Sequence, residues 1–255
     1  MAIEVFNRTE KKFLITDEVY RAIKPQLEEY MELDAFSKDG EYYSICNIYY
    51  DTPNHDIIRK SIEKPIYKEK LRLRSYGVVG PRDKVYLEIK KKYNGNVNKR
   101  RTSIYLEEAY CYIEKHQRPR ARKPLGDQIM NEIDYFIQRY PDLVPTLYLS
   151  YERNAMFGIE DPSFRITFDT NIRTRRNEVG LDRGNYGELL LPAGLWIMEA
   201  KITNAVPMWF AKLLSNNHIY PTTFSKYGEE YKRALMRNEI DMTGTTKDNR
   251  IYIGG

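Results

Sequence analysis

This sequence is poor in the residues that build disulfide frameworks, histidine sites and membrane spans. Only two of its 255 residues are cysteines, and their spacing fits neither a disulfide scaffold nor a zinc motif. Only three are histidines, which argues against a histidine-based triad or a His-rich metal site. No stretch approaches the roughly 18 apolar residues of a membrane-spanning helix, and the N-terminus lacks the apolar core of a signal peptide. We therefore expect a cytoplasmic protein with no membrane segment in this chain.

The chain also lacks a large excess of one charge. Charged residues make up 30% of the sequence, yet the formal net charge is only +5. A strong local field must therefore come from the arrangement of charges and not from their sum. The hydrophobic content of 42% is enough for one large domain.

Basic residues recur with the periodicity of a β-strand. Between Lys68 and Arg74 every even-numbered position is basic, while Leu71 and Leu73 lie at odd positions. Successive side chains of a strand point to opposite faces, so this segment has one cationic and one apolar face. A solvated outer face explains one such strand, but the same pattern recurs elsewhere and includes glutamates. The other charged residues that share a face of their predicted strands are Arg8, Glu10, Lys12, Glu88, Lys90, Lys99, Arg101, Arg165, Asp169, Glu199 and Lys201.

The pattern predicts one α+β domain over residues 1–240, dominated by an antiparallel sheet, and a polar tail at 241–255. The predicted strands are 4–15, 42–50, 66–76, 84–92, 98–106, 145–153, 163–170 and 194–202. The predicted helices are one that Thr16 or Asp17 caps at its N-terminus, and 55–62, 126–139, 206–215 and 226–237. Closing the sheet with its polar face inward would give a barrel lined by about a dozen cations. A bound polyanion would relieve the repulsion among them.

These residues carry a resemblance to a known family. The segments that carry it, in the family's order, are Arg8-Thr-Glu-Lys-Lys12, Ile48-Tyr-Tyr-Asp-Thr-Pro53, Lys70-Leu-Arg-Leu-Arg74, Leu87-Glu-Ile-Lys90, Tyr151-Glu-Arg-Asn-Ala155, Arg165-Ile-Thr-Phe-Asp169, Met198-Glu-Ala-Lys201 and Phe224-Ser-Lys226. The chain resembles the VTC catalytic domain, the polyphosphate polymerase module of the triphosphate tunnel metalloenzyme (CYTH-like) superfamily. The resemblance implies an eight-stranded antiparallel β-barrel tunnel with a basic interior and flanking helices.

The resemblance also assigns roles to individual positions. The residues on catalytic, phosphate-binding positions are Lys12, Arg72, Arg74, Lys90, Arg153, Lys201 and Lys226. Further substrate contacts would come from Arg8, Lys70, Lys99, Arg101, Arg165, Tyr151 and Ser225. Glu199 falls on the metal-coordinating position, and Glu10 and Glu88 are further candidates for the metal or its waters. The implied cofactor is Mn²⁺ or Mg²⁺, and the implied substrates are ATP and inorganic polyphosphate.

One departure from the superfamily pattern bears on the reaction. The Glu-x-Glu-x-Lys signature of related triphosphatases reads Arg8-x-Glu10-x-Lys12 in this chain. Replacing a carboxylate with arginine weakens an arrangement suited to metal-activated water. The departure favours a polymerase that transfers the ATP γ-phosphate to a growing polyphosphate chain and releases ADP.

Two other functions remain open at this stage. A triphosphatase on the same scaffold would use water as the acceptor. A non-catalytic module could bind polyanions or nucleic acid, because the 22 tyrosines include four among the basic strands, Tyr67, Tyr76, Tyr86 and Tyr93. Carboxylates at Glu10, Glu88 and Glu199 would repel a nucleic-acid backbone, so no nucleic-acid partner is expected.

Several other features have ordinary structural explanations. Trp196, Met208, Trp209 and Phe210 are expected to pack in the core. The three histidines, His55, His116 and His218, are expected at the surface because they have no partner spacing. Asp51, which precedes Thr52-Pro53, is expected to be a turn residue.

Overall fold

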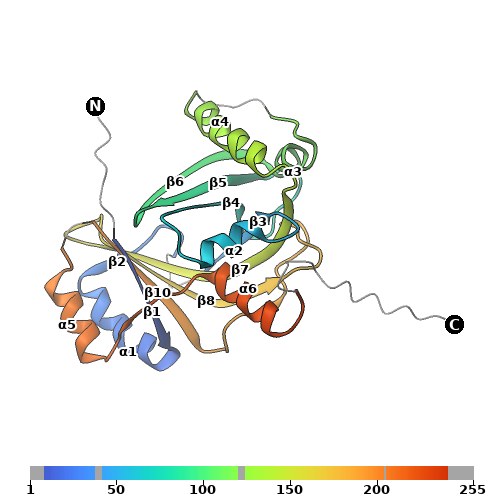
Figure 1. The fold of residues 1–255 in the computed structure, drawn as a ribbon. Coiled ribbons are helices and arrows are strands. Elements are labelled where there is room, and N and C mark those ends of the chain that lie inside the picture. Colours follow the sequence, from blue (N-terminus) through green and yellow to red (C-terminus); the bar gives the residue numbers. More distant parts are fainter. Residues whose placement is uncertain (1–8, 38–41, 120–123, 204, 241–255) are drawn as a thin grey trace.

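The computed structural model describes residues 9–37, 42–119, 124–203 and 205–240. Within them, eleven strands form one antiparallel sheet (Figure 1). The strands are β1 (Thr9–Thr16), β2 (Met31–Leu33), β3 (Tyr43–Asp51), β4 (Tyr67–Tyr76), β5 (Lys84–Tyr93), β6 (Asn96–Tyr105), β7 (Val144–Gly158), β8 (Arg165–Arg175), β9 (Glu188–Leu189), β10 (Leu195–Ile202) and β11 (Pro221–Thr222). Their order is β11-β1-β10-β8-β7-β3-β4-β5-β6, with β2 beside β7 and β9 beside β8.

Helices flank this sheet on both faces. They are α1 (Asp17–Glu28), α2 (Asp56–Ile62), α3 (Leu106–Lys115), α4 (Pro124–Arg139), α5 (Met208–Asn216) and α6 (Lys226–Met236). The expected cap of α1 is confirmed, because the Thr16 hydroxyl accepts a hydrogen bond from the backbone N–H of Val19. The structure describes no part of the predicted tail at 241–255, and Arg8 also lies outside the described residues.

All eight predicted strands form, but the sheet departs from the expected eight-stranded closed barrel. The three additional strands, β2, β9 and β11, have only two or three residues each, too few to show a periodic pattern. In the part of the chain that the structure describes, no pairing joins β6 to β11 at the two ends of the strand order. The sheet is therefore open by backbone hydrogen bonding.

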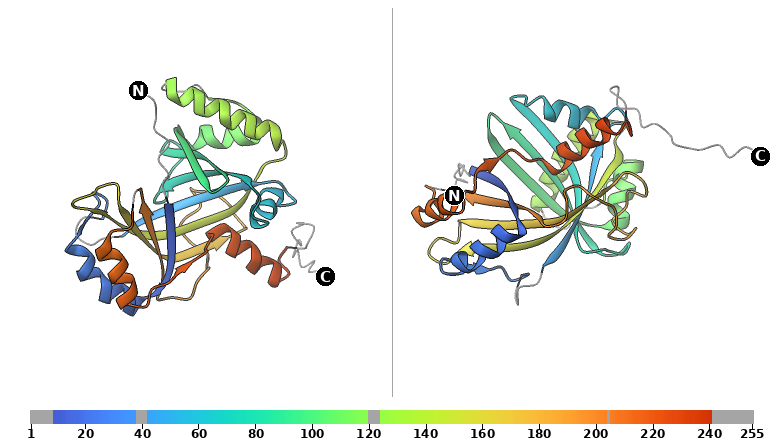
Figure 2. Two further views of the ribbon diagram at one scale, coloured as in Figure 1. Left: turned by 60° about the vertical axis from the view of Figure 1, so that its left-hand side comes forward. Right: turned by 90° about the horizontal axis from the view of Figure 1, so that it is seen from below.

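Curvature brings the two halves of the open sheet toward one another. Strand β7 is the longest, and its pairing shifts register between Tyr49 and Tyr50 on β3 and between Ser150 and Glu152 on its β8 side. Such irregularities bend a strand and increase its twist. As a result β4 and β5 face β1 across the concave side (Figure 2), and Lys90 on β5 reaches within 3.8 Å of Glu10 on β1.

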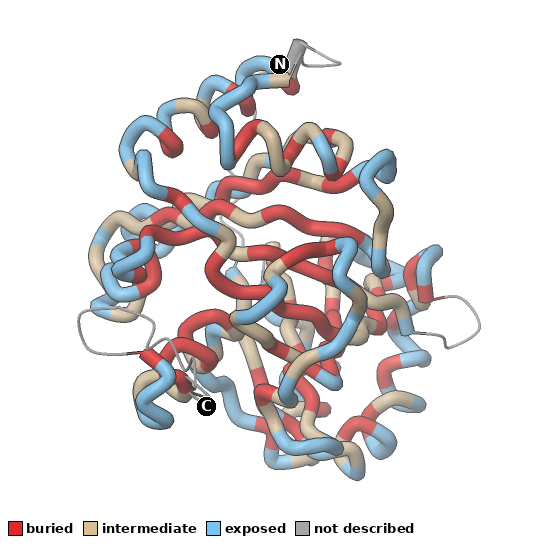
Figure 3. Tube along the Cα trace, turned by 90° about the vertical axis from the view of Figure 1, so that its right-hand side faces the viewer, coloured by how far each residue is buried: buried red, intermediate tan, exposed pale blue. Residues whose placement is uncertain are grey.

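The apolar core lies mostly on the convex face of the sheet. Helices α3 and α4 cover β3–β6 there, and α1 and α5 cover β1, β8 and β10. Buried segments follow the strands through the centre of the molecule (Figure 3). Trp196 and Phe210 are buried as expected, whereas Met208 is 71% exposed because it begins α5 on its outer side. No helix among the described residues is long and apolar enough to cross a membrane.

A third apolar group fills part of the concave face. We call it the concave apolar cluster: Ile45, Ile58, Leu147, Leu149, Tyr151, Ile172, Leu190, Ile197, Tyr227, Tyr231, Ala234 and Ile240. Its residues come from inward positions of β3, β7, β8 and β10 and from α2 and α6. His55 packs against it, with its ring 5.5 Å from that of Tyr231. The surface prediction for His55 is therefore wrong, while His116 and His218 are exposed.

Candidate functional site

The alternation of residues along the strands places the predicted charges on the concave face. On β4, Leu71 and Leu73 are fully buried in the convex core, so Arg72 and Arg74 point inward. The same alternation on β8 buries Ile166 and Phe168 and turns Arg165 and Asp169 inward (the register pairs Asp169 with Arg153 of β7). The hydrophobic pattern thus sets the direction of the charged side chains that the strands carry into the site.

Glu88 anchors one side of this charged face. It is 1% exposed, and its carboxylate lies 2.6 Å from Arg72 Nε, 2.7 Å from Lys99 Nζ and 3.9 Å from Arg74 Nε. Burial opposes its ionisation, but the charge of Arg72, followed by those of Arg74 and Lys99, lowers its pKa to about 2. Glu88 therefore lies in close contact with two cations, Arg72 and Lys99, with Arg74 just beyond hydrogen-bonding distance.

Asp169 has the matching role on the opposite side of the face. Arg153 donates two hydrogen bonds to it, at 2.6 and 2.8 Å, and Lys226 from the start of α6 donates a third at 2.6 Å. Burial opposes ionisation, but Arg153 and Lys226 hold the pKa of Asp169 well below its usual range. Sequence reasoning placed Asp169 on the correct face but gave it no role. Its inward position on β8, opposite the inward basic residue Arg153 of β7, was the signal that could have indicated an ion pair.

Glu199 differs from these two carboxylates because no cation binds it closely. The nearest ammonium groups are those of Lys201 at 3.6 Å and Lys12 at 3.8 Å, both beyond hydrogen-bonding distance. Burial raises its pKa, but Lys201 and Lys12 together lower it to about 2, so the group is ionised at neutral pH. Lys12 donates its own hydrogen bond to the backbone carbonyl of Phe224 at 2.9 Å.

The donors around Glu199 fit a hard divalent cation that also binds phosphate. Thr167 pairs with Glu199 across β8 and β10, and its buried hydroxyl has no hydrogen-bond partner among the described residues. Glu10 and Glu88 do not converge with Glu199, and no group of three His, Cys, Asp or Glu residues in the described ranges could hold a metal. Mg²⁺ is commonly held by one or two carboxylates together with substrate phosphates and waters. Glu199 with Thr167 suits that mode of binding.

Lysines dominate the β4–β6 side of the face. Lys70, Lys90 and Lys99 are cross-strand neighbours, an arrangement that like charges disfavour without an anion. Burial lowers the pKa of Lys99 to about 8, and the negative charge of Glu88 offsets only part of this effect. Burial also lowers the pKa of Lys70 to about 8, although Tyr49 acts in the opposite sense. Both shifts would be reversed by a nearby polyanion.

Tyrosines support the cations at the centre of the face. Arg74 donates to Tyr151 Oη at 3.1 Å and to Asn47 Oδ1 at 2.9 Å, so its guanidinium is fixed by two neutral partners. The ring of Tyr151 also lies under two cations, with Lys226 Nζ 4.5 Å and Arg153 Cζ 5.1 Å from its centroid.

Tyr49 is a second residue that sequence reasoning did not assign. Arg72 donates to its hydroxyl at 3.4 Å. Burial raises the pKa of a phenol, but Arg72 and Lys70 outweigh it and lower the pKa of Tyr49 to about 8. Its inward-facing position on β3 could have indicated a contact with a basic residue of the neighbouring strand, but not the shift in its pKa.

The remaining predicted contacts lie at the margins of the charged face. Arg101 lies over the Tyr86 ring at 4.7 Å from its centroid, and Arg165 pairs with Asp34 at 3.2 Å. Ser225 caps α6, because its hydroxyl accepts a hydrogen bond from the Gly228 N–H. The cap fixes the N-terminus of α6, and with it Lys226, at the charged face.

Asp51 is more than the expected turn residue. It is fully buried, and its carboxylate accepts hydrogen bonds from the backbone N–H groups of Thr52, Ile57 and Ile58 and from the Tyr227 hydroxyl. It therefore ties the start of α2 to α6. Since α6 carries Lys226, Asp51 helps to position the site from behind the concave apolar cluster.

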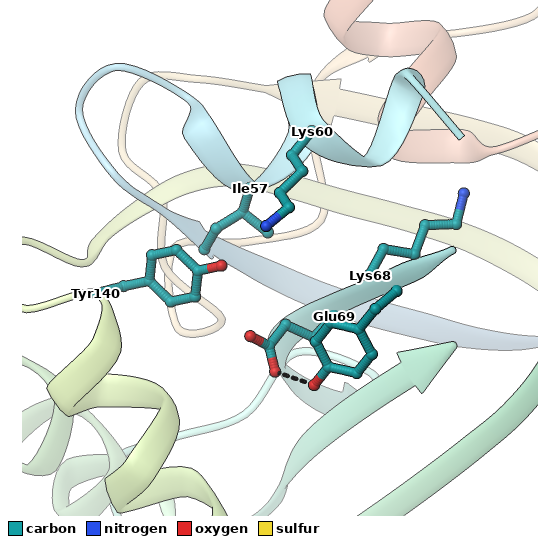
Figure 4. A pocket seen from close by; sticks show the side chains of 6 residues that line it. Ile57, Lys60, Lys68, Glu69 and Tyr140 are labelled. Carbon is teal, nitrogen blue, oxygen red and sulfur yellow. Dashed lines mark hydrogen bonds between the residues drawn. The ribbon is translucent and has the colours of Figure 1, made fainter. Parts of the chain in front are cut away.

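A small pocket near the start of β4 is separate from this face. It is lined by Ile57, Lys60, Tyr67, Lys68, Glu69 and Tyr140 (Figure 4). Its one carboxylate, Glu69, accepts hydrogen bonds from the Tyr67 hydroxyl at 2.7 Å and from Arg139 at 3.2 Å. These contacts engage both carboxylate oxygens of Glu69, so we assign no ligand to this pocket.

Comparisons with known proteins agree on the family and the fold. A family model described as the VTC domain matches residues 7–235. A candidate adenylate cyclase from Bacillus halodurans has a similar structure, with a TM-score of 0.53 and 15% identity over 85% of this chain and 92% of that chain. A candidate adenylate cyclase from Vibrio parahaemolyticus (TM-score 0.44, 13% identity, 88% and 97% coverage) and a Mimivirus capping enzyme triphosphatase (0.34, 10%, 84% and 91%) are more distant. No curated protein sequence matches the chain.

Proposed function

Because this chain belongs to the VTC domain family, we propose that it is a metal-dependent polyphosphate polymerase that transfers the γ-phosphate of ATP to inorganic polyphosphate. The observation that carries the proposal is the division of labour among the inward carboxylates. Glu88 and Asp169 are each bound by several cations, whereas Glu199 has no cation within hydrogen-bonding distance. The face thus offers many fixed cations and, in Glu199, a carboxylate beside the unpartnered Thr167 hydroxyl that could bind a metal.

This arrangement suits phosphoryl transfer without a side-chain nucleophile. An oxygen of the terminal phosphate of the chain would form a bond to the γ-phosphorus. The bond from that phosphorus to the β–γ bridging oxygen would break, and ADP would leave with its electron pair. Catalysis of this kind depends on in-line positioning and on charge neutralisation. Arg72, Arg74 and Arg153 supply forked donors, and Lys12, Lys90, Lys201 and Lys226 supply point charges.

The fixed geometry of the arginines is the main contribution of the fold. Glu88 and Asp169 orient Arg72 and Arg153 before substrate arrives, so less side-chain entropy is lost on binding. Bound Mn²⁺ or Mg²⁺ would add charge stabilisation to the phosphates near Glu199 and Thr167. Lys70, Lys99, Arg101 and Arg165 extend the cationic face on either side.

A triphosphatase on the same face is the second candidate, and one observation favours it. The concave apolar cluster, built around α6, occupies the continuation of the charged face along β7 and β10. Leu149 precedes Tyr151, and Ile197 precedes Glu199, at inward positions of these strands. A long polyanion would have to leave on the other side, whereas a short triphosphate needs no such path.

Analysis of the products distinguishes these two reactions. The purified protein is incubated with ATP and Mn²⁺, with and without a short polyphosphate primer, and the products are resolved by gel electrophoresis and ³¹P NMR. The proposal predicts polyphosphate longer than the primer together with ADP, and neither product with Glu199→Ala. Orthophosphate as the main product would show that water is the acceptor, and the polymerase assignment would then be wrong.

A further inference from the structure

We propose that four aromatic side chains at one end of the charged face form the binding site for the base of the nucleotide donor. We call them the aromatic rim: Phe36, which follows β2, and Tyr43, Tyr76 and Tyr86, on β3, β4 and β5. The inference rests on the proposed function only in taking the donor to be a nucleotide. It adds a site for a part of the substrate that the cationic residues do not contact.

The rim is a continuous set of rings. Tyr76 stacks nearly parallel to Phe36, with centroids 6.2 Å apart and planes 11° apart, and meets Tyr86 edge-on at 5.8 Å. Tyr43 contacts both Phe36, at 5.8 Å, and Tyr76, at 6.2 Å. Phe36 is 72% exposed and Tyr76 is 44% exposed. Both side chains therefore present ring surface to solvent, outside their mutual contact, and are not part of the core.

The rim is joined to the cationic face through the strands. Tyr76 lies two residues beyond Arg74, and Tyr86 lies two residues before Glu88, so each shares the inward face of its strand. Tyr43 is the register partner of Arg153. A nucleotide whose base lies on the rim would therefore have its phosphates directed toward Arg74 and Arg153.

Polar contacts tie the rim to neighbouring cations. Asp34 accepts a hydrogen bond from the Tyr43 hydroxyl at 3.2 Å and another from Arg165, also at 3.2 Å. Arg101 lies over the face of Tyr86 at 4.7 Å from the ring centroid. The rim thus has cations beside its rings, which is the combination expected for a ligand with both a π-face and phosphates.

A base is favoured over other occupants by this chemistry. Inorganic polyphosphate has no ring to stack, and it gains nothing from Phe36 or Tyr76. Stacking on aromatic rings stabilises any base, because every base has a π-face. The four side chains of the rim provide stacking surface, but none of them has an amide group that could distinguish the hydrogen-bonding edges of different bases. We therefore expect ATP and GTP to bind with affinities within about threefold of each other.

The test compares ATP with inorganic tripolyphosphate, which has the same phosphates but no base. Isothermal titration calorimetry at fixed Mg²⁺ gives the Kd of each for the full chain and for Phe36→Leu and Tyr76→Leu, which keep apolar side chains but remove the rings. Tyr135→Leu, at a 64% exposed position on α4, is the matched control. The inference predicts that each rim variant weakens ATP about tenfold, within the range of single base-stacking contacts, and changes tripolyphosphate less than twofold.

Phe36→Trp gives a second readout. This variant enlarges the stacking surface, so it should bind ATP at least as tightly as the unaltered chain does. Equal losses for ATP and tripolyphosphate in the rim variants would overturn the inference, as would unchanged ATP binding or no binding of ATP by the unaltered chain. The proposed function and the aromatic rim can each fail independently of the other. A protein that makes no polyphosphate but shows the ring-dependent preference for ATP supports the rim. One that makes polyphosphate with ATP affinity insensitive to Phe36→Leu contradicts the rim alone.

Discussion

Asp169→Asn tests the claim that buried carboxylates hold the cations of the site. Asp169 is fully buried and accepts three hydrogen bonds from Arg153 and Lys226, whose side chains are only 12% and 14% exposed. The amide keeps the shape of the side chain but leaves both cations without a counter-charge. Removing one partner of a buried ion pair destabilises a protein by about 3–5 kcal/mol. Since asparagine retains one acceptor oxygen, we expect a loss of about 3 kcal/mol.

This loss should be visible in thermal unfolding. For a domain of this size about 1 kcal/mol lowers the Tm by roughly 2–4 °C, so Asp169→Asn should melt about 6–12 °C below the unaltered protein. Tripolyphosphate should stabilise the variant more than the unaltered protein, because it supplies the missing negative charge to Arg153 and Lys226. Asp142→Asn, at an exposed position, is the control and should melt unchanged.

Differential scanning fluorimetry with and without tripolyphosphate measures both effects. The reasoning is refuted if Asp169→Asn melts within about 2 °C of the unaltered protein, because such a carboxylate would not be stabilising two buried cations. It is also refuted if tripolyphosphate raises the Tm of the variant less than that of the unaltered protein.

Three further predictions concern other groups of the charged face. The pKa of Glu88 is lowered to about 2 from a usual value of 4.5, so the ionised group stabilises the fold above pH 4.5 and loses this effect as the pH falls toward 2. We therefore expect Glu88→Gln to be less stable than the unaltered protein by roughly 3 kcal/mol at pH 7. Urea unfolding at pH 3 should show a smaller difference between the two proteins. Glu199→Gln should weaken Mn²⁺ binding in the presence of tripolyphosphate at least about tenfold, measured by electron paramagnetic resonance, and an unchanged affinity would exclude Glu199 as the ligand. Tyr49 should ionise near pH 8, which a titration of absorbance at 295 nm would detect. This ionisation step should be absent from Tyr49→Phe, and tripolyphosphate should move it to higher pH because it offsets the charges of Arg72 and Lys70. A step near pH 8 that remains in Tyr49→Phe would contradict this assignment.

The sequence predicts the charged face well because one rule governs it. Alternation along a strand places Glu88 with Lys90 and Glu199 with Lys201 regardless of how the strands pair. The convex leucines and isoleucines then fix which face is inward. All eight long strands were predictable for this reason, and so was the direction of the charged side chains on them.

Strand alternation does not predict which partner each charged side chain contacts. Asp169 meets Arg153 across a β7–β8 pairing and meets Lys226 from a helix 57 residues later in the chain. The first contact depends on the register of that pairing, and the second depends on how far the sheet curves, to which the irregular pairings of β7 contribute. The same dependence explains why an open sheet formed where a closed barrel was expected.

Local signals were present for one element that the prediction missed. Helix α3 starts directly after β6, and its buried residues Leu106, Ala109 and Ile113 recur at helical spacing. Glu108 accepts a hydrogen bond from the Tyr105 N–H, as in a capping box. Predicting a strand to residue 106 hid this start. The short strands β9 and β11 had no comparable signal, because two residues carry no period.

The most direct test of the central claim follows oxygen atoms from water. The protein is incubated with ATP, Mn²⁺ and a short polyphosphate primer in H₂¹⁸O, and the phosphate-containing products are analysed by mass spectrometry. Transfer to a phosphate acceptor predicts ADP formed in step with polyphosphate that contains no ¹⁸O. Orthophosphate that carries one ¹⁸O for each ADP released would show that water attacks the γ-phosphorus, and it would contradict the account.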